Sequence, residues 1–188
     1  GKKKISFSVP TGNFGDVFAG YLAKKMGLPI DKLIVATNEN DILHRAISKG
    51  DYVSKEVKET LSPSMDIQLA SNFERLIYYV NNSDSEKTAE IMKKVKQNSY
   101  QIEKRDLDII QKDFLSESCN EKETLGIIKK NYEENGMVLD PHTAIGVGAA
   151  QKLSLNDCVV LSTAHPCKFP DATKNAINKH EKLPEELQ

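Results

Sequence analysis

A glycine-containing loop near the start of the chain has the residue types of an anion-binding site. Residues 11–16 read Thr-Gly-Asn-Phe-Gly-Asp and separate a β-favouring run at 5–9 from an amphipathic helical run at 16–26. Gly12 and Gly15 allow a positive φ and leave no Cβ in the path of a ligand. Backbone N–H groups of the loop and of the first helical turn then converge where the helix dipole is positive, which favours a phosphate.

The strength of such a site comes mainly from its backbone donors. Each charge-assisted hydrogen bond contributes about 1.5–3 kcal/mol, so three or four N–H groups can hold a phosphate monoester without Lys or Arg. The spacing fits neither the Walker loop nor the dinucleotide-binding pattern, so a nucleotide is not the first expectation. Two interpretations stay open from spacing alone, a phosphate site and a simple turn bent by its glycines. Asp16 would repel a phosphate, and we expect its side chain to turn away.

A second group of polar residues, at 162–169, follows a buried apolar run at 158–161. Ligands of open α/β sheets lie beyond the carboxyl ends of the strands, so this group and the glycine loop are expected to face one crevice. A hydroxyl there can donate to or accept from a ring nitrogen. His165 alone is more typical of a structural histidine. The run at 140–143, Asp-Pro-His-Thr, is more typical of a helix start than of an acid–base pair.

The elements that must position these residues form an α/β core. Strands at 5–9 and 32–36 flank the helix at 16–26, a unit that predicts a parallel sheet with a right-handed crossover. A helix rich in small residues at 143–153 is expected to pack closely against a neighbour. The strand at 158–161 would then bring the second polar group to the sheet.

The middle of the chain differs from this core. Residues 83–136 are dense in Lys, Glu, Ser and Asn, and they predict two or three amphipathic surface helices, one capped near Asn120 and ended by Gly136. Their alternating charges indicate a solvated face rather than a binding surface. We therefore expect one incomplete domain, with an α/β core at 1–82, a charged helical insertion at 83–136 and the second part of the core at 137–188.

Within the first part of the core, residues 71–74 predict a capping box ahead of a further helix.

Composition excludes several classes of function. Lys and Arg number 26 and Asp and Glu number 27, so the formal charge of −1 gives no reason to expect nucleic-acid or anionic-membrane binding. No apolar run approaches the length of a membrane span. The three cysteines lack metal-ligand spacing and indicate free thiols in a reducing compartment; they are Cys119, Cys158 and Cys167. A cytoplasmic protein without a metal site is therefore predicted.

The chain begins without Met and directly before a predicted buried strand, so we expect a fragment of a longer protein.

Six segments in a fixed order resemble the threonine synthase family, and they lie along the whole chain. They are residues 8–16, 23–29, 36–43, 62–67, 140–144 and 163–169. The similarity is to the carboxyl-terminal portion of the long, fungal- and enterobacterial-type branch. It implies part of the large, mostly parallel sheet domain of a fold-type II pyridoxal-phosphate enzyme. It also implies a lyase that converts O-phospho-L-homoserine and water into L-threonine and phosphate.

The resemblance assigns roles to particular residues. The loop that binds the cofactor phosphate aligns with Gly12, Asn13, Phe14, Gly15 and Asp16, and the hydroxyl that meets the pyridine nitrogen aligns with Thr163. Such a hydroxyl leaves the nitrogen largely uncharged, whereas a carboxylate would keep it protonated. Residues expected near the substrate are Asn38, Asp41, Ser64, Asp66, His165 and Lys168. Lys168 either offers a cation to the substrate phosphate or is an ordinary surface lysine.

One departure from the family decides what this chain can do. The lysine that attaches the cofactor lies in a Phe-Lys-Asp context before the glycine loop in the family, and nothing in this chain matches it. No catalytic residue is therefore assigned here. The missing amino-terminal part of the same protein is the expected partner, and residues 1–188 alone are expected to be inactive. Two alternatives stay open: a related phospho-lyase that gives a 2-oxo acid, and a non-catalytic phosphate-binding module.

Overall fold

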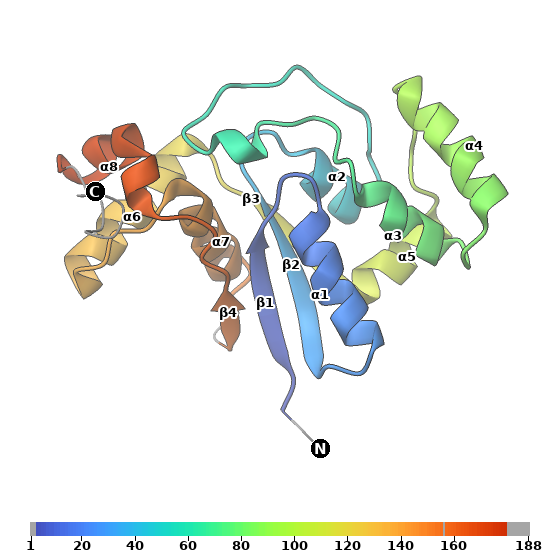
Figure 1. The fold of residues 1–188 in the computed structure, drawn as a ribbon, viewed down its shortest axis with the longest axis horizontal. Helices are drawn as coiled ribbons and strands as arrows, with labels where there is room; N and C mark the ends of the chain where they lie inside the picture. Colours follow the sequence, from blue (N-terminus) through green and yellow to red (C-terminus); the bar gives the residue numbers. More distant parts are fainter. Residues whose placement is uncertain (1–2, 156, 180–188) are drawn as a thin grey trace.

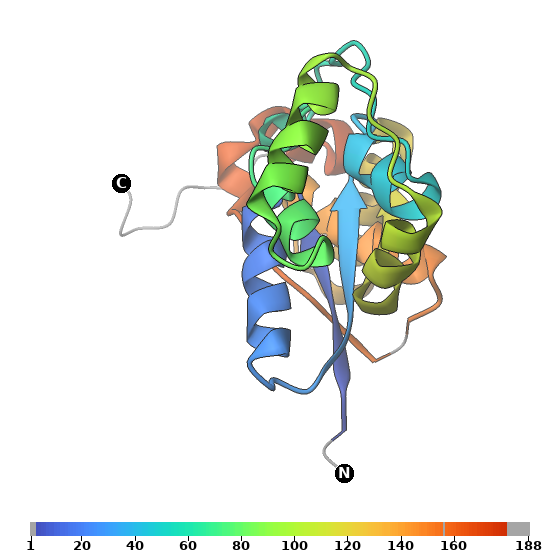
Figure 2. The same ribbon diagram turned by 90° about the vertical axis from the view of Figure 1, so that its right-hand side faces the viewer.

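A parallel sheet of four strands lies between two groups of helices (Figures 1 and 2). The computed structural model describes residues 3–155 and 157–179. The elements are, in chain order, β1 (Ile5–Pro10), α1 (Gly15–Lys25), β2 (Ile30–Thr37), α2 (Ile42–Lys49), the 3-10 turn η1 (Pro63–Met65), α3 (Phe73–Val80), α4 (Ser85–Lys96), α5 (Lys104–Asp113), β3 (Phe114–Ser118), α6 (Glu121–Asn135), α7 (Pro141–Lys152), β4 (Cys158–Val160), the 3-10 turn η2 (Pro166–Lys168) and α8 (Pro170–Ile177). Within these described ranges, no helix has the length and apolar character that crossing a membrane requires.

The strands follow the order β3-β2-β1-β4, and every neighbouring pair is parallel. Ser8 in the middle of β1 is level with Ile34 of β2 on one side and with Val160 of β4 on the other. The predicted α/β class with a parallel sheet is thus confirmed. Because all strands run the same way, the segments that leave their carboxyl ends meet at a single edge of the sheet.

Both faces of the sheet are buried. On β2, Leu33 and Val35 belong to the apolar core shared with α1, α2, α3 and α5, while Ile34 and Ala36 belong to the core shared with α7. All four side chains are at most 1% exposed. A strand that is covered on both faces needs a continuous apolar run instead of an alternating one, which explains the sequence of this strand.

The segment at 83–136 contains a strand that the charge pattern did not predict. β3 pairs with β2 along Phe114–Ser118, so the interpretation of this segment as only helical was incomplete. Its Phe114 is fully buried, and its ring lies 5.3 Å from that of Tyr21 on α1. The two predicted caps at the ends of α6 are confirmed, with a capping box at Asn120 and a left-handed Gly136. The boundaries at 82 and 136 stay a prediction.

The small residues of α7 let this helix pack closely against its neighbours, as predicted, and at Gly146 the neighbour is the sheet. A Cβ at Gly146 would come within 2.9 Å of Cγ1 of Val160, and one at Gly148 within 2.6 Å of the Cys119 sulfur. The Ser8 hydroxyl on β1 donates to the carbonyl of Gly146 at 2.7 Å. The amino end of α7 therefore has a fixed place relative to β1 and β4.

An ion-pair cluster joins the end of α1 to the end of α5 and makes stability depend on pH. The Asp113 carboxylate accepts from Lys24 at 2.8 Å and from Lys25 at 3.0 Å. Burial raises the pKa of Asp113, but the hydrogen bonds and charges of the two lysines outweigh burial and leave this pKa below its ordinary value. The carboxylate therefore contributes stability above its unfolded-state pKa, which is lost as pH falls through the lower folded-state pKa.

We expect Asp113→Asn to lower the free energy of unfolding by up to about 1 kcal/mol at neutral pH. The difference from the unmodified protein should shrink as pH falls from about 5, and urea unfolding across pH measures it. Asp108→Asn is the control, because its carboxylate forms an exposed helix pair with Lys104. If the difference in free energy of unfolding between Asp113→Asn and the parent stays constant over this pH range, the ion pairs of Asp113 are not the source of the pH dependence.

Candidate functional site at the carboxyl edge of the sheet

Three of the predicted site segments leave adjacent strands at the same edge. The glycine loop follows β1, Asn38 follows β2, and Thr163 follows β4. Short backbone bonds fix the segments to one another: the Thr11 N–H donates to the carbonyl of Ala36 at 2.8 Å, and the Leu161 N–H donates to the carbonyl of Ser8 at 3.0 Å. In Figure 1 this edge lies at the upper end of β1 and β2. The topology therefore brings together residues as distant in the sequence as Gly12 and Thr163.

The glycine loop presents free backbone donors at this edge. Among the described residues, no acceptor is recorded for the backbone N–H groups of residues 12–17. The Thr11 hydroxyl is already committed, since it donates to the carbonyl of Val9 at 2.6 Å. The first amides of a helix have no intrahelical partner, so this set of donors is available to an anion.

The backbone of the loop differs from the expectation that its glycines adopt positive φ. The left-handed residue is Phe14, with φ 67°, and neither Gly12 nor Gly15 is among the residues with positive φ. A non-glycine residue in this region costs about 1–3 kcal/mol. Phe14 is fully buried, and its ring packs 5.1 Å from Phe73 and 5.7 Å from Phe114. This aromatic packing holds the loop in a conformation that its own sequence disfavours.

The two glycines serve the loop through their lack of a side chain. A Cβ at Gly12 would lie 2.4 Å from the carbonyl oxygen of Ser64, so this position requires glycine for the close approach of η1. A Cβ at Gly15 would meet only the amide nitrogen of Asn72, at 3.4 Å. Ser64, a predicted substrate residue, is exposed and lies directly against the loop.

The loop is also tied to α3. The carbonyl of Asn13 accepts from both the backbone N–H and the side-chain amide of Asn72, each at 3.1 Å. The N-cap of α3 is Asn72 and not Ser71, and it makes no side-chain cap bond, so the capping box predicted at 71–74 is wrong. In the described part of the chain no side-chain partner is recorded for Asp16, which is exposed in the first turn of α1.

Two predicted substrate residues, Asn38 and Asp66, form a polar cluster with each other. The Asn38 amide donates to Oδ1 of Asp66 at 2.7 Å and to the Thr60 hydroxyl at 2.9 Å. The same carboxylate accepts from the Asn40 amide at 3.0 Å and from the Thr60 N–H at 2.8 Å. Asn38 and Asn40 are 2% exposed. Their hydrogen bonds to Asp66 join the end of β2 to the segment that carries Ser64 and hold this segment in place.

The remaining predicted substrate residue near α2, Asp41, is held in an ion pair. Its carboxylate accepts from Nε of Arg45 at 2.8 Å. Arg45 is 6% exposed and also contacts Asp51 and the carbonyl of Val53. The contacts of Arg45 hold the chain segment that follows α2. The Asp41 carboxylate is thus paired with Arg45 within the protein.

The second polar group, residues 162–169, is more exposed to solvent than the cluster of Asn38 and Asp66. Thr163 is exposed, and its backbone N–H donates to the Thr143 hydroxyl at 3.3 Å. The His165 ring nitrogen Nδ1 accepts from the Cys167 N–H at 3.2 Å and so caps η2, which agrees with the structural interpretation of this histidine. Lys168 is exposed and lines a cavity of about 180 Å³ together with Thr60 and other residues of the η1 region. The structure thus brings Lys168 near the segment that carries Ser64.

Sequence reasoning missed four residues that support this edge. They are Asn40, Thr60, Asn72 and Thr143. Asn40 and Thr143 lie in segments that resemble the family, and Asn72 lies in the predicted capping box, but none of these patterns assigned the residue a role at the site. Thr60 stands in a loop segment without a recognisable motif. The partners of these four residues are 6 to 59 positions away, and no local spacing signals such contacts.

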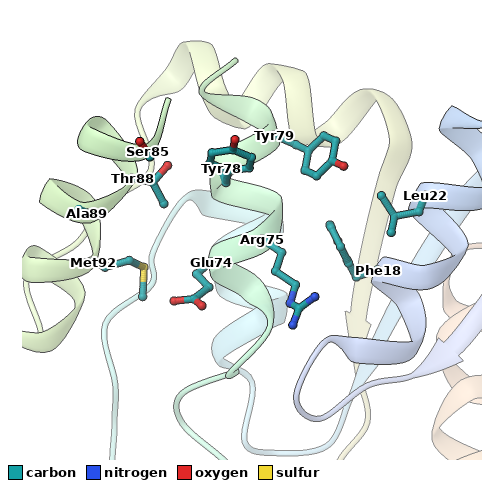
Figure 3. A pocket seen from close by; sticks show the side chains of 10 residues that line it. All are labelled: Phe18, Leu22, Glu74, Arg75, Tyr78, Tyr79, Ser85, Thr88, Ala89 and Met92. Atoms are coloured by element: carbon teal, nitrogen blue, oxygen red, sulfur yellow. The ribbon is translucent and has the colours of Figure 1, made fainter. Parts of the chain in front are cut away.

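An apolar cavity of about 570 Å³ lies elsewhere, between α1, α3 and α4 (Figure 3). Aromatic side chains from α1 and α3 and Met92 from α4 surround it, and Glu74 and Arg75 extend from α3 at its rim. None of the predicted site residues lines it. The candidate site is therefore the sheet edge and not this cavity.

The chain is similar to known proteins over nearly its whole length. A family profile described as threonine synthase, C-terminal, matches residues 143–188. Threonine synthase of Saccharomyces cerevisiae is 46% identical over 99% of this chain and 42% of its own length, and that of Pseudomonas aeruginosa is 45% identical over 98% and 40%. The crystal structure of PLP-bound threonine synthase from Brucella melitensis superposes with a TM-score of 0.95 at 46% identity, over 98% of this chain and 40% of the other. The chain thus spans about two fifths of the length of these relatives.

Proposed function

We propose that this chain, which belongs to the threonine synthase family and matches its carboxyl-terminal part, provides the phosphate loop and ring contact of a pyridoxal-phosphate site. In the full-length protein this site would serve the conversion of O-phospho-L-homoserine and water into L-threonine and phosphate. The observation that carries the proposal is the set of backbone N–H groups at residues 12–17 without acceptors in the described chain, at the end of β1.

The loop fits a phosphate ester. Its donors lie at the amino end of α1, where the helix dipole adds about 0.3–2 kcal/mol for an anion. Neither Gly12 nor Gly15 places a side chain over the amides, and Phe14 is turned into the core. Residues 12–16 would thus hold the phosphate through main-chain atoms, and the exposed Asp16 would extend away from it.

Thr163 is proposed as the partner of the pyridine nitrogen. It follows β4, the strand next to β1, and its hydroxyl has no recorded partner among the described residues. A neutral hydroxyl at this position leaves the ring nitrogen largely uncharged, whereas a carboxylate would keep it protonated. Pyridoxal phosphate, when bound, supplies the electron sink for negative charge on the substrate carbon atoms.

Ser64 and Lys168 are proposed to bind the substrate phosphate. Both are exposed, Ser64 lies against Gly12 of the loop, and Lys168 lines a cavity with residues of the segment that carries Ser64. Asn38 and Asp66 would act by holding the segment of Ser64, and His165 by shaping the turn before Lys168. Asp41 would orient α2 through Arg45. The lysine that attaches the cofactor would come from the part of the relatives that this chain does not match, so residues 1–188 alone are expected to bind without turnover.

The test compares two probes and then examines products, using the full-length protein that carries this chain. Pyridoxal 5'-phosphate should bind at least about 100-fold more tightly than pyridoxal, which lacks the phosphate, because several charge-assisted bonds are lost. With O-phospho-L-homoserine, we expect threonine and phosphate in equal amounts.

Other outcomes select the alternatives. Formation of 2-oxobutyrate without threonine would favour the related phospho-lyase. Tight binding of pyridoxal phosphate without any turnover would favour the non-catalytic phosphate-binding module. Equal affinity for pyridoxal and its phosphate would remove the basis of the loop assignment.

A further inference from the structure

The first turn of α7 makes more polar contacts than a helix cap requires. The Asp140 carboxylate accepts from the N–H groups of His142 at 2.9 Å and Thr143 at 3.3 Å. It also accepts from the Thr143 hydroxyl and lies 3.1 Å from ring nitrogen Nδ1 of His142. The Asp140 side chain is 1% exposed. Capping accounts for the two backbone bonds but not for the two side-chain contacts.

The donor and the acceptor in the hydrogen bonds of Asp140 and Thr143 can be assigned. Burial raises the pKa of Asp140, but hydrogen bonds from His142 and Thr143 outweigh it and keep this pKa below its ordinary value. An ionised carboxylate only accepts, so the Thr143 hydroxyl must donate its proton to Asp140. The lone pairs of Thr143 are then free to accept the N–H of Thr163, at 3.3 Å. Asp140 thereby orients the group that holds the end of β4.

A second contact from the same turn reaches the other end of this segment. The rings of His142 and Phe169 have centroids 4.8 Å apart, with planes inclined by 58°. Phe169 directly follows η2. The first turn of α7 thus contacts both ends of residues 163–169, and this segment contains Thr163, His165 and Lys168.

We propose that Asp140, His142 and Thr143 are positioning residues that fix segment 163–169 over the sheet edge, with Thr143 setting the place of the Thr163 hydroxyl against the cofactor ring. The inference rests on the proposed function for its ring contact. The turn is suited to this role because α7 is packed directly on β1 and β4 through Gly146. None of the three residues needs to touch the cofactor or the substrate.

Thr143→Val tests the proposal in the full-length protein, because valine keeps the shape of threonine but cannot accept the Thr163 N–H. Without any cofactor, amide hydrogen exchange at Thr163 should become about tenfold faster, the usual size of one lost hydrogen bond. The dissociation constant of pyridoxal 5'-phosphate should rise about tenfold. Thr143→Ser restores the acceptor and should return both values to those of the parent protein.

Thr124→Val is the matched control. Thr124 is a buried threonine whose hydroxyl donates to the carbonyl of Asn120, the N-cap of α6, and among the described residues no hydrogen bond joins it to segment 163–169. Its loss should leave Thr163 exchange and cofactor affinity unchanged. Should Thr143→Val fail to fold, Thr143→Cys is measured in the same way, since its thiol is only a weak acceptor of similar size.

The outcomes separate this proposal from the proposed function. Parent-like exchange at Thr163 in Thr143→Val overturns the positioning role. Faster exchange with unchanged affinity for pyridoxal 5'-phosphate also overturns it, while leaving the phosphate loop standing. If neither the parent nor Thr143→Ser binds pyridoxal 5'-phosphate more tightly than pyridoxal, both proposals fail.

Discussion

Gly12→Ala is expected to weaken the binding of pyridoxal 5'-phosphate to the full-length protein about 30-fold or more. The added Cβ would lie 2.4 Å from the carbonyl oxygen of Ser64, a backbone atom that cannot move without displacing η1. Overpacking of this kind costs about 1–3 kcal/mol, and here the cost distorts the loop that holds the phosphate. Equilibrium binding of pyridoxal 5'-phosphate and urea unfolding measure the two effects.

Gly15→Ala provides a matched control, because the same methyl group there meets only the side-chain amide of Asn72 at 3.4 Å. Alanine is also favourable at the start of a helix relative to glycine. We expect stability close to that of the parent protein and a smaller loss of affinity than for Gly12→Ala. Equal cofactor affinity in both variants and in the parent would contradict the phosphate-loop assignment.

Asp66→Ala is expected to lower the free energy of unfolding by about 2–5 kcal/mol. Its carboxylate accepts four hydrogen bonds, two from Thr60 and one each from Asn38 and Asn40, at 2.7–3.0 Å. Removing the acceptor takes one partner from each of these part-buried donors, and a donor left unpaired costs about 1–3 kcal/mol when no water replaces the carboxylate. Urea unfolding gives the total, and amide exchange at Thr60 reports the local change.

The control for Asp66 is Asp84→Ala. The Asp84 carboxylate accepts the N–H of Lys87 at the start of α4, and losing such a cap costs about 1 kcal/mol. If Asp66→Ala costs no more than Asp84→Ala, the polar cluster does not hold the segment that carries Ser64. An increase in KM for O-phospho-L-homoserine with unchanged stability would instead indicate that Asp66 binds the substrate directly.

Local patterns were sufficient for the elements around the loop. Apolar runs bounded by turn residues predicted β1, α1 and β2 to within two residues at each end, because these elements are formed from residues that are near in sequence. β3 was missed. Its Phe114 is fully buried, but Ser116 and Glu117 give the run a polar character, and only the partner strand β2 supplies the reason for its strand conformation.

The glycine loop illustrates the same limit at the site. Its sequence indicated that glycines were needed, but the reason lay in the approach of Ser64, which is 52 positions away. The left-handed residue was Phe14, whose strained backbone is offset by packing against Phe73 and Phe114. A side chain's tertiary packing can thus reverse a local backbone preference.

The sequence by itself determined the α/β class, the parallel sheet, the position of the glycine loop and the resemblance to threonine synthases, since each depends on residue types at short spacing. Only the tertiary structure decided three contacts. Asn38 forms a hydrogen bond with Asp66, and the backbone N–H of Thr163 donates to the Thr143 hydroxyl. Gly12 is needed because Ser64 approaches it closely. The physical reason is that these contacts join side chains across strand ends. Chain topology, and not local periodicity, sets which strand ends are neighbours.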